Sequence, residues 1–396
     1  MKIVFIHTDF RIYWPARLNA LNTFLKSKGI DLDVIEIAGG GSPYNFAATS
    51  NNKPSFWHCL FPDKRMEEIP PGVANKALRE KLDELMPDIV FSGAIAFPSG
   101  AASVRWAAEK GRKVVVFDNA RLQDVPRKWY VNFIKRRIYS SVDGIFCPAP
   151  AWNETFKYFG FHDKQIFYGL NAVDNSFWAE NLGIRAINLP ARYILTAGRQ
   201  VPKKNFLFLL KAFNKYYNQV KDPASLVLVG NGPKREILED YTRKHGISLI
   251  NFMPFLSQEE LSYVYHSALF FVLPSKFGET WGNVVNEAMA SGLPVLVSEQ
   301  VGCSSTLVKP GINGFTFSSH DEEELANLFI KVTSLEEKER EAMGSMSKEI
   351  ISEWGLERFC TGVEEAILYV SGRDKKTSDL FSRIIIRLWK GRYRPT

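Results

Sequence analysis

Short apolar runs alternate with stretches of helical period along the chain, and this alternation constrains the fold more than any other feature. The first run, Lys2–Phe10, ends in a polar turn, and a helical pattern follows at Pro15–Lys28. The further runs of the first half are Leu32–Ile37, Asp88–Phe91, Lys113–Phe117, Gly144–Cys147 and Gln165–Tyr168. Buried strands separated by helices are typical of a parallel sheet that is covered on both faces. Residues 38–72 are rich in Gly, Pro, Asn and Ser, so we expect a long loop or insertion there.

The same pattern starts again after a linker-like stretch at residues 180–191. The strands predicted in this second half are Tyr193–Ala197, Ser225–Val229, Leu249–Phe252, Leu269–Leu273 and Pro294–Val297. The sequence therefore predicts an α/β protein of two doubly wound parallel-sheet, Rossmann-like domains that face a cleft. We place these domains at residues 1–180 and 181–371, with the last helix able to cross back to the first domain. Residues 372–396 form a separate basic amphipathic tail.

Positive charge is concentrated in residues 372–396, which carry eight Lys and Arg against two Asp and Glu. The other residues carry 42 against 41, so the body of the chain is close to neutral and lacks the basic face that nucleic-acid binding needs. The four cysteines are far apart, which favours free thiols in a reducing compartment. No signal peptide and no run of the ~18 apolar residues that span a bilayer is visible, so we expect a cytoplasmic protein.

The stretch Phe277–Ala290 (FGETWGNVVNEAMA) follows a predicted strand and begins a predicted helix. Glu279 and Glu287 are eight positions apart, which on a helix separates them by about 80° and about 12 Å. Carboxylates this far apart cannot flank one bond, but they can hold the two ends of an elongated ligand such as a sugar nucleotide. Backbone amides at the helix N-terminus would face the diphosphate of that ligand. These amides belong to Thr280, Trp281 and Gly282.

A second loop, Gly198–Asn205 (GRQVPKKN), directly follows the predicted strand Tyr193–Ala197. Arg199 offers a planar fork of donors and Lys204 a point charge, and both suit phosphate oxygens. In this position they would neutralise a diphosphate leaving group as it departs. The histidines are scattered, with no H-x-x-x-H pair, and we expect a transfer reaction that needs no metal ion.

These motifs together resemble the retaining glycosyltransferases of family 4, which have the two-domain GT-B fold. The resemblance rests on GRQVPKKN, LVLVGNGP, LFFVLPS, ETWGNVVNEAMASGLPVLVS and GINGFTF, in the family's order across residues 190–320. It implies that Arg199 and Lys204 bind the donor diphosphate, that Glu279 contacts the donor sugar and that Glu287 contacts the ribose. It also implies that the second domain binds the donor and the first domain the acceptor. We expect a UDP-sugar first, a GDP-sugar second, and no bound cofactor.

Two features depart from the family's pattern. Many members carry a glycine-rich loop after the first strand, where this chain has His7–Arg11 (HTDFR). Many also place a histidine at a strand end in the middle of the first domain, where this chain has Asp118 and Asn119. Asp118 or His7 can take that histidine's place as a catalytic residue, although both also fit an ordinary turn or loop contact. Retaining transfer can proceed without either, because the leaving diphosphate can accept the proton on the same face.

Two basic segments of the chain are interleaved with aromatic residues. Arg121–Ile138 carries six Lys and Arg and one Asp, and Leu380–Arg394 groups its apolar residues on one side of a predicted helix. Basic amphipathic helices with aromatic residues suit an anionic membrane surface, whereas the alternative is a helix packed on the protein with a solvated basic face. The composition of Gly372–Ser378 predicts a hinge ahead of the tail.

The sequence thus predicts a hexosyltransferase that retains anomeric configuration and uses a nucleotide diphosphate sugar. We expect a lipid-linked or membrane-proximal glycan as acceptor, as in bacterial surface-polysaccharide assembly, and peripheral binding at the inner face of the cytoplasmic membrane. Two alternatives stay open: another GT-B-like enzyme, such as a phosphorylase or a sugar-nucleotide epimerase, and a two-lobed sugar-binding protein. The cationic tail argues against the first, and the set of Arg199, Lys204, Glu279 and Glu287 argues against the second.

Overall fold

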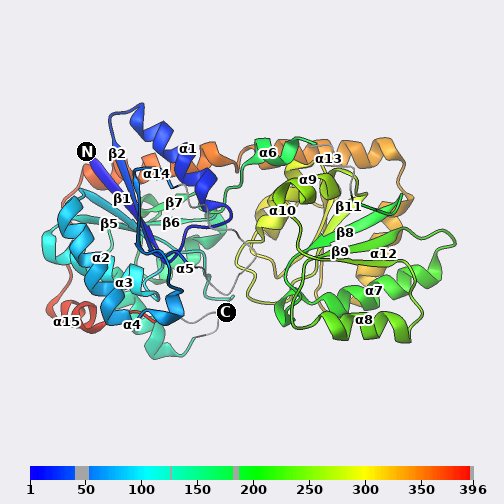
Figure 1. Cartoon of the computed structure of the whole chain (residues 1–396), viewed down its shortest axis with the longest axis horizontal. Helices are drawn as coiled ribbons and strands as arrows, with labels where there is room; N and C mark the ends of the chain where they lie inside the picture. The colour runs from blue at the N-terminus through cyan, green and yellow to red at the C-terminus, as the bar shows by residue number, and fades with distance from the viewer. Residues whose placement is uncertain (41–52, 125–126, 182–186, 393–396) are drawn as a thin grey trace. The chain divides into compact units, whose positions relative to one another are not determined.

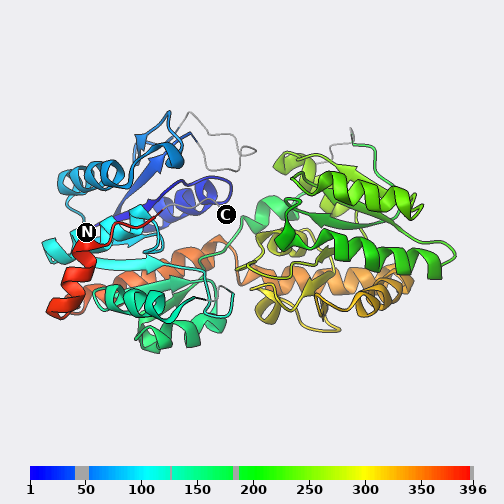
Figure 2. The same ribbon diagram turned by 90° about the horizontal axis from the view of Figure 1, so that it is seen from below.

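The computed structural model describes residues 1–40, 53–124, 127–181 and 187–392, and the chain divides into two compact units. Unit 1 comprises Met1–Ala172 and Leu356–Thr396, and unit 2 comprises Val173–Gly355. The chain therefore passes from unit 1 into unit 2 and then returns to unit 1. Figure 1 and Figure 2 show that each unit is a twisted sheet with helices packed on its faces.

Unit 1 is built on a seven-stranded sheet in the order β3-β2-β1-β4-β5-β6-β7, in which every neighbouring pair is parallel. The strands are β1 (Lys2–His7), β2 (Asp31–Ala38), β3 (Trp57–Phe61), β4 (Ile89–Ser92), β5 (Lys113–Phe117), β6 (Gly144–Cys147) and β7 (Ile166–Tyr168). Helices cover both faces, which is why most of these strands are continuous apolar runs in the sequence. The order reverses between β1 and β4, and in such sheets ligands bind beyond the carboxyl ends of the strands at that switch point.

The helices of unit 1 come from both parts of the chain. They are α1 (Trp14–Lys26), α2 (Pro71–Leu85), α3 (Pro98–Lys110), α4 (Trp129–Tyr139), α5 (Asn153–Tyr158), α14 (Leu356–Ser371) and α15 (Leu380–Leu388), with short 3-10 turns at Met66–Glu68, Pro150–Trp152 and Asp163–Gln165. Helix α14 packs on α1, β6 and β7, and its Phe359 and Val363 lie in the same apolar core as Phe5 and Leu21. The segment after residue 355 therefore completes the core of unit 1.

Unit 2 is built on a six-stranded sheet in the order β10-β9-β8-β11-β12-β13, again parallel throughout. The strands are β8 (Tyr193–Ala197), β9 (Ser225–Val229), β10 (Ile250–Met253), β11 (Phe270–Leu273), β12 (Val295–Ser298) and β13 (Gly314–Phe317). The helices are α6 (Asn175–Ala179), α7 (Phe206–Gln219), α8 (Arg235–Lys244), α9 (Gln258–His266), α10 (Asn283–Ala290), α11 (Ser304–Leu307), α12 (Glu322–Ser334) and α13 (Glu337–Ser352), with a 3-10 turn at Pro202–Lys204. The two parallel sheets confirm the predicted fold class, and the switch point of this second sheet lies between β8 and β11.

Two strands of the structure were not expected from the sequence. The first, β3, lies within the stretch 38–72 that we expected to be a loop, and it pairs in parallel with β2. The expected loop is therefore wrong at β3, which the sequence does not reveal because this edge strand is half-buried and polar residues surround it. It is also wrong from Pro71 onward, where α2 begins. Residues 41–52 of that stretch lie outside the described part of the chain. The second, β13, pairs with β12 and contains the GFTF part of a motif in which we expected no strand.

The stretch ahead of the tail helix is anchored, so the expected hinge is wrong. Residues 373–379 have no regular secondary structure, yet the Lys375 ammonium donates to the carbonyl of Ser141 at 2.7 Å and to Asp143 Oδ2 at 2.6 Å. The backbone N–H of Lys376 donates to Asp143 Oδ1 at 2.9 Å. The buried carboxylate of Asp143 therefore fixes a segment whose composition alone suggested flexibility.

Candidate functional site

Two loops that carry the sequence motifs meet at the switch point of unit 2. Gly198–Asn205 follows β8, and residues 274–282 follow β11, the neighbouring strand. The backbone N–H of Lys276 donates to the carbonyl of Lys203 at 3.0 Å, which ties the two loops together. The motifs GRQVPKKN and ETWG are thus neighbours at the sheet edge where open α/β folds bind ligands.

One residue from each loop contributes to a buried ion pair. Lys204 Nζ lies 2.7 Å from Glu279 Oε2, and only 9% of the lysine side chain and 12% of the glutamate side chain are exposed. The hydroxyl of Ser275 donates to the same carboxylate oxygen at 3.2 Å. The structure therefore brings two of the predicted site residues into direct contact, and each compensates the charge of the other.

The surroundings of Glu279 keep its carboxylate ionised. Burial raises the pKa of Glu279, but the charges of Lys204 and Lys203 and the hydrogen bonds from Lys204 and Ser275 outweigh burial, so the pKa lies below its ordinary value. A charged carboxylate is a strong acceptor for sugar hydroxyls, and an ammonium is a strong donor to phosphate oxygens. An anionic ligand at this edge would compete with Glu279 for the charge of Lys204.

Glycines follow β8 and β9, and their lack of a side chain lets the loops after these two strands lie close together. A Cβ on Gly230, after β9, would lie 2.2 Å from the carbonyl oxygen of Gly198, after β8. Gly198 has a φ of +149°, and a Cβ there would lie 3.1 Å from Cε of Lys204. A side chain at Gly198 would therefore push Lys204 away from Glu279. Arg199, the next residue, is half-buried in the same loop.

Helix α10 begins later than the sequence suggested. Gly282 is its N-cap, with a φ of +101°, so Glu279 lies in the turn ahead of the helix. The expected separation of the two glutamates along one helix is therefore wrong, because the chain turns at Gly282 before the helix starts. Glu287 does lie on α10, where it is 3% exposed and accepts a hydrogen bond from the hydroxyl of Tyr265 at 2.8 Å.

The turn Thr280–Gly282 is held by the segment that follows β12. The backbone N–H of Gly302 donates to the carbonyl of Glu279 at 2.9 Å, and that of Cys303 donates to the carbonyl of Trp281 at 3.1 Å. These two bonds hold Glu279 and Trp281, and with them the turn that leads into the N-terminal end of α10. The positive end of the helix dipole favours an anion at such a position.

Asp118, the predicted catalytic residue of unit 1, is already engaged in a buried network. It follows β5, is 4% exposed, and accepts hydrogen bonds from the Lys135 ammonium at 2.7 Å, the Tyr139 hydroxyl at 2.8 Å and the Ala120 N–H at 2.9 Å. Burial raises the pKa of Asp118, but the Lys135 charge and these hydrogen bonds hold it below its ordinary value. Burial lowers the pKa of Lys135, and the charge of Asp118 opposes that effect. The network links β5 to α4.

His7 ends β1 at the switch point of unit 1 and is surrounded by aromatic rings. The ring centroids that lie between 5.4 and 6.1 Å from that of His7 belong to Phe10, Trp14, Phe97 and Phe117. Among the described residues, no hydrogen-bond partner faces His7 Nδ1. Burial lowers the pKa of His7, and the charge of Asp9 opposes this only in part, so the imidazole is neutral near pH 7.

Three further side chains belong to the site in unit 2 but were not identified from the sequence. Ser275 lies within the motif LFFVLPS, whose position ahead of Glu279 was a usable signal. Tyr265 lies on α9, and nothing in the sequence connects it with Glu287. Asn286 accepts a hydrogen bond from the indole N–H of Trp281 at 2.9 Å, which joins the turn to α10.

Within the described residues, no group of three or more His, Cys, Asp or Glu side chains is placed to hold a metal ion. All four cysteines are free thiols in this structure. Across the same residues, no helix has both the length and the apolar character that crossing a bilayer requires.

Part of the chain is similar to a known family of proteins. Residues 180–350 match the family described as glycosyl transferases group 1, and this range covers most of unit 2. An uncharacterized glycosyltransferase from Methanocaldococcus jannaschii is 33% identical over 158 residues, which are 38% of this chain and 40% of that protein. The chain matches less than half of the length of this relative and of the next curated relatives.

Solved structures resemble nearly the whole chain. Sucrose-phosphate synthase from Thermosynechococcus elongatus has a TM-score of 0.74 at 16% identity, over 94% of this chain and 99% of that one. HepE from Anabaena, in complex with UDP, has a TM-score of 0.70 at 16% identity, over 93% and 100%. These likenesses establish the GT-B fold. The family match and the curated relative are similarities of part of the chain to glycosyltransferases.

Proposed function

We propose that this chain is a retaining glycosyltransferase, of the type found in family 4, that transfers a sugar from a UDP-sugar without a metal ion. The acceptor is a lipid-linked or membrane-proximal glycan, as in bacterial surface-polysaccharide assembly. The enzyme acts at the inner face of the cytoplasmic membrane, to which it binds peripherally. The observation that carries the proposal is the buried Lys204–Glu279 pair at the switch point of unit 2.

Lys204 and Arg199 are assigned to the donor diphosphate. Both lie in the loop after β8, and Lys204 is nearly buried, so its charge is poorly screened by solvent. As the bond between the sugar C1 and the diphosphate oxygen breaks, negative charge grows on the diphosphate, and these cations stabilise it. The acceptor oxygen forms its bond to C1 on the same face, and its proton passes to the departing diphosphate. No protein base is required for this step.

The two glutamates are assigned to the two ends of the donor. Glu279, kept ionised by its neighbours, accepts hydrogen bonds from hydroxyls of the sugar. Glu287, buried in α10 and oriented by Tyr265, accepts hydrogen bonds from the ribose. The amides of Thr280, Trp281 and Gly282 face the diphosphate at the N-terminus of α10.

A UDP-sugar is preferred over a GDP-sugar as the donor. Structures of Anabaena HepE contain UDP and UDP-glucose, and that protein shares the fold of this chain. We assign Asp118 no chemical step, because its carboxylate already accepts hydrogen bonds from Lys135, Tyr139 and Ala120. The cationic residues 372–396 support a membrane-proximal acceptor.

The experiment that tests this function measures nucleotide release from UDP-, GDP- and ADP-sugars in the presence of a chelator. We expect release of UDP from a UDP-sugar, slowly by hydrolysis when no acceptor is present and faster when a glycolipid acceptor is added. We also expect NMR of the product to show the same axial or equatorial bond at C1 as in the donor. Binding of a UDP-sugar without any release of UDP would favour the sugar-binding alternative. An inverted product bond, or a requirement for a divalent cation, would overturn the retaining, metal-independent assignment.

A further inference from the structure

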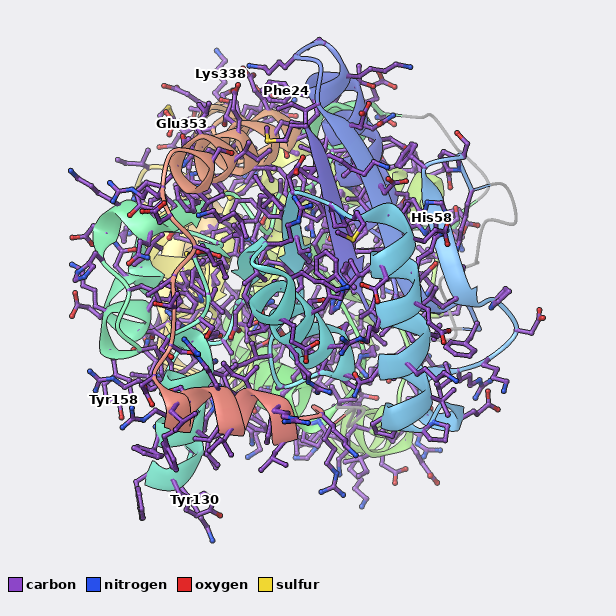
Figure 3. The ribbon with its side chains drawn as sticks, turned by 90° about the vertical axis from the view of Figure 1, so that its left-hand side faces the viewer. Phe24, His58, Tyr130, Tyr158, Lys338 and Glu353 are labelled. Atoms are coloured by element: carbon purple, nitrogen blue, oxygen red, sulfur yellow. The ribbon has the colours of Figure 1, made fainter. Side chains whose placement is uncertain are left out.

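Two helices of unit 1 that are distant in sequence lie side by side and both expose large apolar side chains. Helix α15 packs against α4, and Figure 3 shows α15 with Tyr130 projecting outward close to it. Trp129 is 78% exposed, and Leu380 and Leu388 are 74% and 72% exposed. These are among the most exposed apolar side chains of the described residues, and they gather on one pair of helices.

Helix α15 has an unusual orientation for a helix at a protein surface. An amphipathic helix normally turns its apolar stripe toward the core. Here Leu380, Ile384 and Leu388, spaced four residues apart, form a stripe that faces solvent. The residues of α15 that are buried against unit 1 are Ser382 and Ile386. The helix therefore keeps an apolar stripe available after it has packed on the protein.

Side chains join the two helices into one surface. The rings of Phe133 and Phe381 have centroids 6.3 Å apart, and the Arg137 guanidinium lies 5.0 Å from the first ring centroid and 5.6 Å from the second. Arg137 also pairs with Asp379 at 3.3 Å. We call this surface the α4–α15 face. Its exposed apolar residues are Trp129, Tyr130, Val131, Phe133, Leu380, Phe381, Ile384 and Leu388.

The charges around the α4–α15 face are almost all positive. The exposed cationic residues of its two segments, 127–139 and 379–392, are Lys128, Arg136, Arg383, Arg387, Lys390 and Arg392. Within residues 127–139 and 379–392 the only acidic residue is Asp379, which pairs with Arg137 and accepts a hydrogen bond from the N–H of Ser382 at the start of α15. Apolar side chains ringed by cations complement a bilayer with anionic headgroups.

The tail is fixed to unit 1 on both sides of α15. Lys375 and Lys376 hold Asp143 ahead of the helix. Beyond it, the indole N–H of Trp389 donates to the carbonyl of Ile95 at 2.6 Å, and Arg105 Nη2 donates to the carbonyl of Trp389 at 2.5 Å. The tail is therefore not a flexible arm that could reach a membrane independently of α4.

We propose that α4 and α15 form a single rigid docking surface for an anionic bilayer, into which both helices insert apolar side chains at the headgroup boundary. This inference rests on the proposed function only for the purpose of docking, which is to bring unit 1 to a membrane-proximal acceptor. Because the face is composite, removing the apolar residues of either helix alone weakens docking. A tail that acted as an independent anchor would not depend on α4.

The test is sedimentation of the full-length protein with phosphatidylglycerol-rich vesicles and with pure phosphatidylcholine vesicles. Trp129→Ser with Tyr130→Ser alters α4, and Leu380→Ser with Leu388→Ser alters α15. Leu368→Ser is the matched control, because Leu368 is 68% exposed on α14 in the same unit but outside the face. We expect each double variant to bind anionic vesicles at least about tenfold more weakly and the control to bind normally.

Charge is tested separately by Arg383→Glu with Arg387→Glu, which replaces two exposed cations without touching the apolar stripe. We expect this variant also to lose binding, and wild-type binding to fall as salt rises. The composite face is overturned if the α4 variant binds normally, if Leu368→Ser loses as much as the others, or if neutral vesicles bind as well as anionic ones. Thermal melting of every variant reports folding, and replacement of exposed side chains leaves the melting temperature nearly unchanged.

Release of UDP from a UDP-sugar in solution, measured on the same proteins, separates this inference from the proposed function. We expect the face variants to release UDP as the wild type does without vesicles. If the wild type binds anionic vesicles through both helices but handles no nucleotide sugar, the proposed function fails and the docking face stands. If it handles the donor but does not bind anionic vesicles, the docking face and the proposed peripheral membrane binding fail, and the proposed sugar transfer stands.

Discussion

Unit 1 and unit 2 each reverse their strand order once, yet the two switch points carry different chemistry. In unit 2 the loops after β8 and β11 present the Lys204–Glu279 ion pair. In unit 1, β1 ends at His7, which lies among aromatic rings, and the nearby charge of Asp118 is paired with Lys135 in the interior. The common architecture places loops at the same edge of each sheet, but the residue types decide what each edge can bind. The charged edge suits a nucleotide diphosphate, and the pair in unit 1 has the features of a structural contact.

The largest expected effect is a loss of folding stability when the buried ion pair of unit 1 is broken. Asp118→Asn leaves the buried Lys135 charge without a counter-ion, which should lower the free energy of unfolding by about 3–5 kcal/mol. Chemical denaturation measures this loss. The double variant Asp118→Asn with Lys135→Met removes both charges and should recover most of it.

The turnover of the folded Asp118→Asn protein then shows whether Asp118 takes part in the reaction. We expect turnover within a few-fold of the wild type when the assay is run well below the melting temperature. A variant that keeps its stability but loses about 100-fold in turnover would mean that unit 1 contributes a chemical group, and the contrast between the two edges would not hold.

The pair in unit 2 should instead control turnover. Under the proposed function, Lys204→Ala removes a charge whose contact with the diphosphate strengthens as that group leaves, so turnover should fall at least about 100-fold, about 2.7 kcal/mol. Lys203→Ala is the matched control, since Lys203 lies in the same loop and acts on Glu279 through its charge but without the ion pair that Lys204 makes. It should cost far less. Near-normal turnover by a well-folded Lys204→Ala protein would remove Lys204 from the site.

Glu287 should affect donor binding more than turnover. Glu287→Gln keeps the shape of the side chain but loses the charge that, under the proposed function, strengthens the hydrogen bonds from the ribose, which is worth about 1.5–3 kcal/mol. Tyr265→Phe removes only the hydroxyl that orients Glu287 and should weaken binding by a smaller amount. Calorimetry with a UDP-sugar measures both. Unchanged affinity in Glu287→Gln would make this glutamate a structural residue of α10.

The smallest expected effect is on acid stability. Glu279 has a folded pKa below its ordinary value of 4.5, so its ionised form adds stability that is complete above that value and is lost as the pH falls through the folded pKa. The melting temperature of Glu279→Gln should therefore fall less steeply than that of the wild type between about pH 5 and about pH 3. If the melting temperatures of the two proteins fell equally with pH, Lys204 would not stabilise the carboxylate of Glu279.

Most of the fold could be predicted because buried parallel strands leave continuous apolar runs. Strand β3 could not, since WHCLF is a half-buried edge strand whose surroundings are rich in turn residues. The anchoring of residues 373–379 could not be predicted either, because it depends on Asp143, which is far away in the sequence. The contact between α4 and α15 has the same origin: Phe133 and Phe381 meet only after the chain has returned to unit 1.

The charged residues of the site could be predicted because both loops directly follow strands of the same sheet. The sequence indicated Lys204 and Glu279 as phosphate and sugar contacts, but not that they would pair with each other. The start of α10 was misplaced because Gly282, with its positive φ, ends the turn and caps the helix. Tyr265 was not identifiable, since its contact with Glu287 joins two helices through the fold rather than through a motif.

We assign the donor diphosphate to the charged edge of unit 2 and not to the buried pair of unit 1. Calorimetric titration of UDP into the wild type, Lys204→Ala and Asp118→Asn, at a temperature where all three are folded, tests this assignment directly. We predict that Lys204→Ala binds UDP at least about tenfold more weakly, about 1.4 kcal/mol, and that Asp118→Asn binds it as the wild type does. Loss of UDP binding in Asp118→Asn with normal binding in Lys204→Ala would overturn this assignment and move the diphosphate site to unit 1.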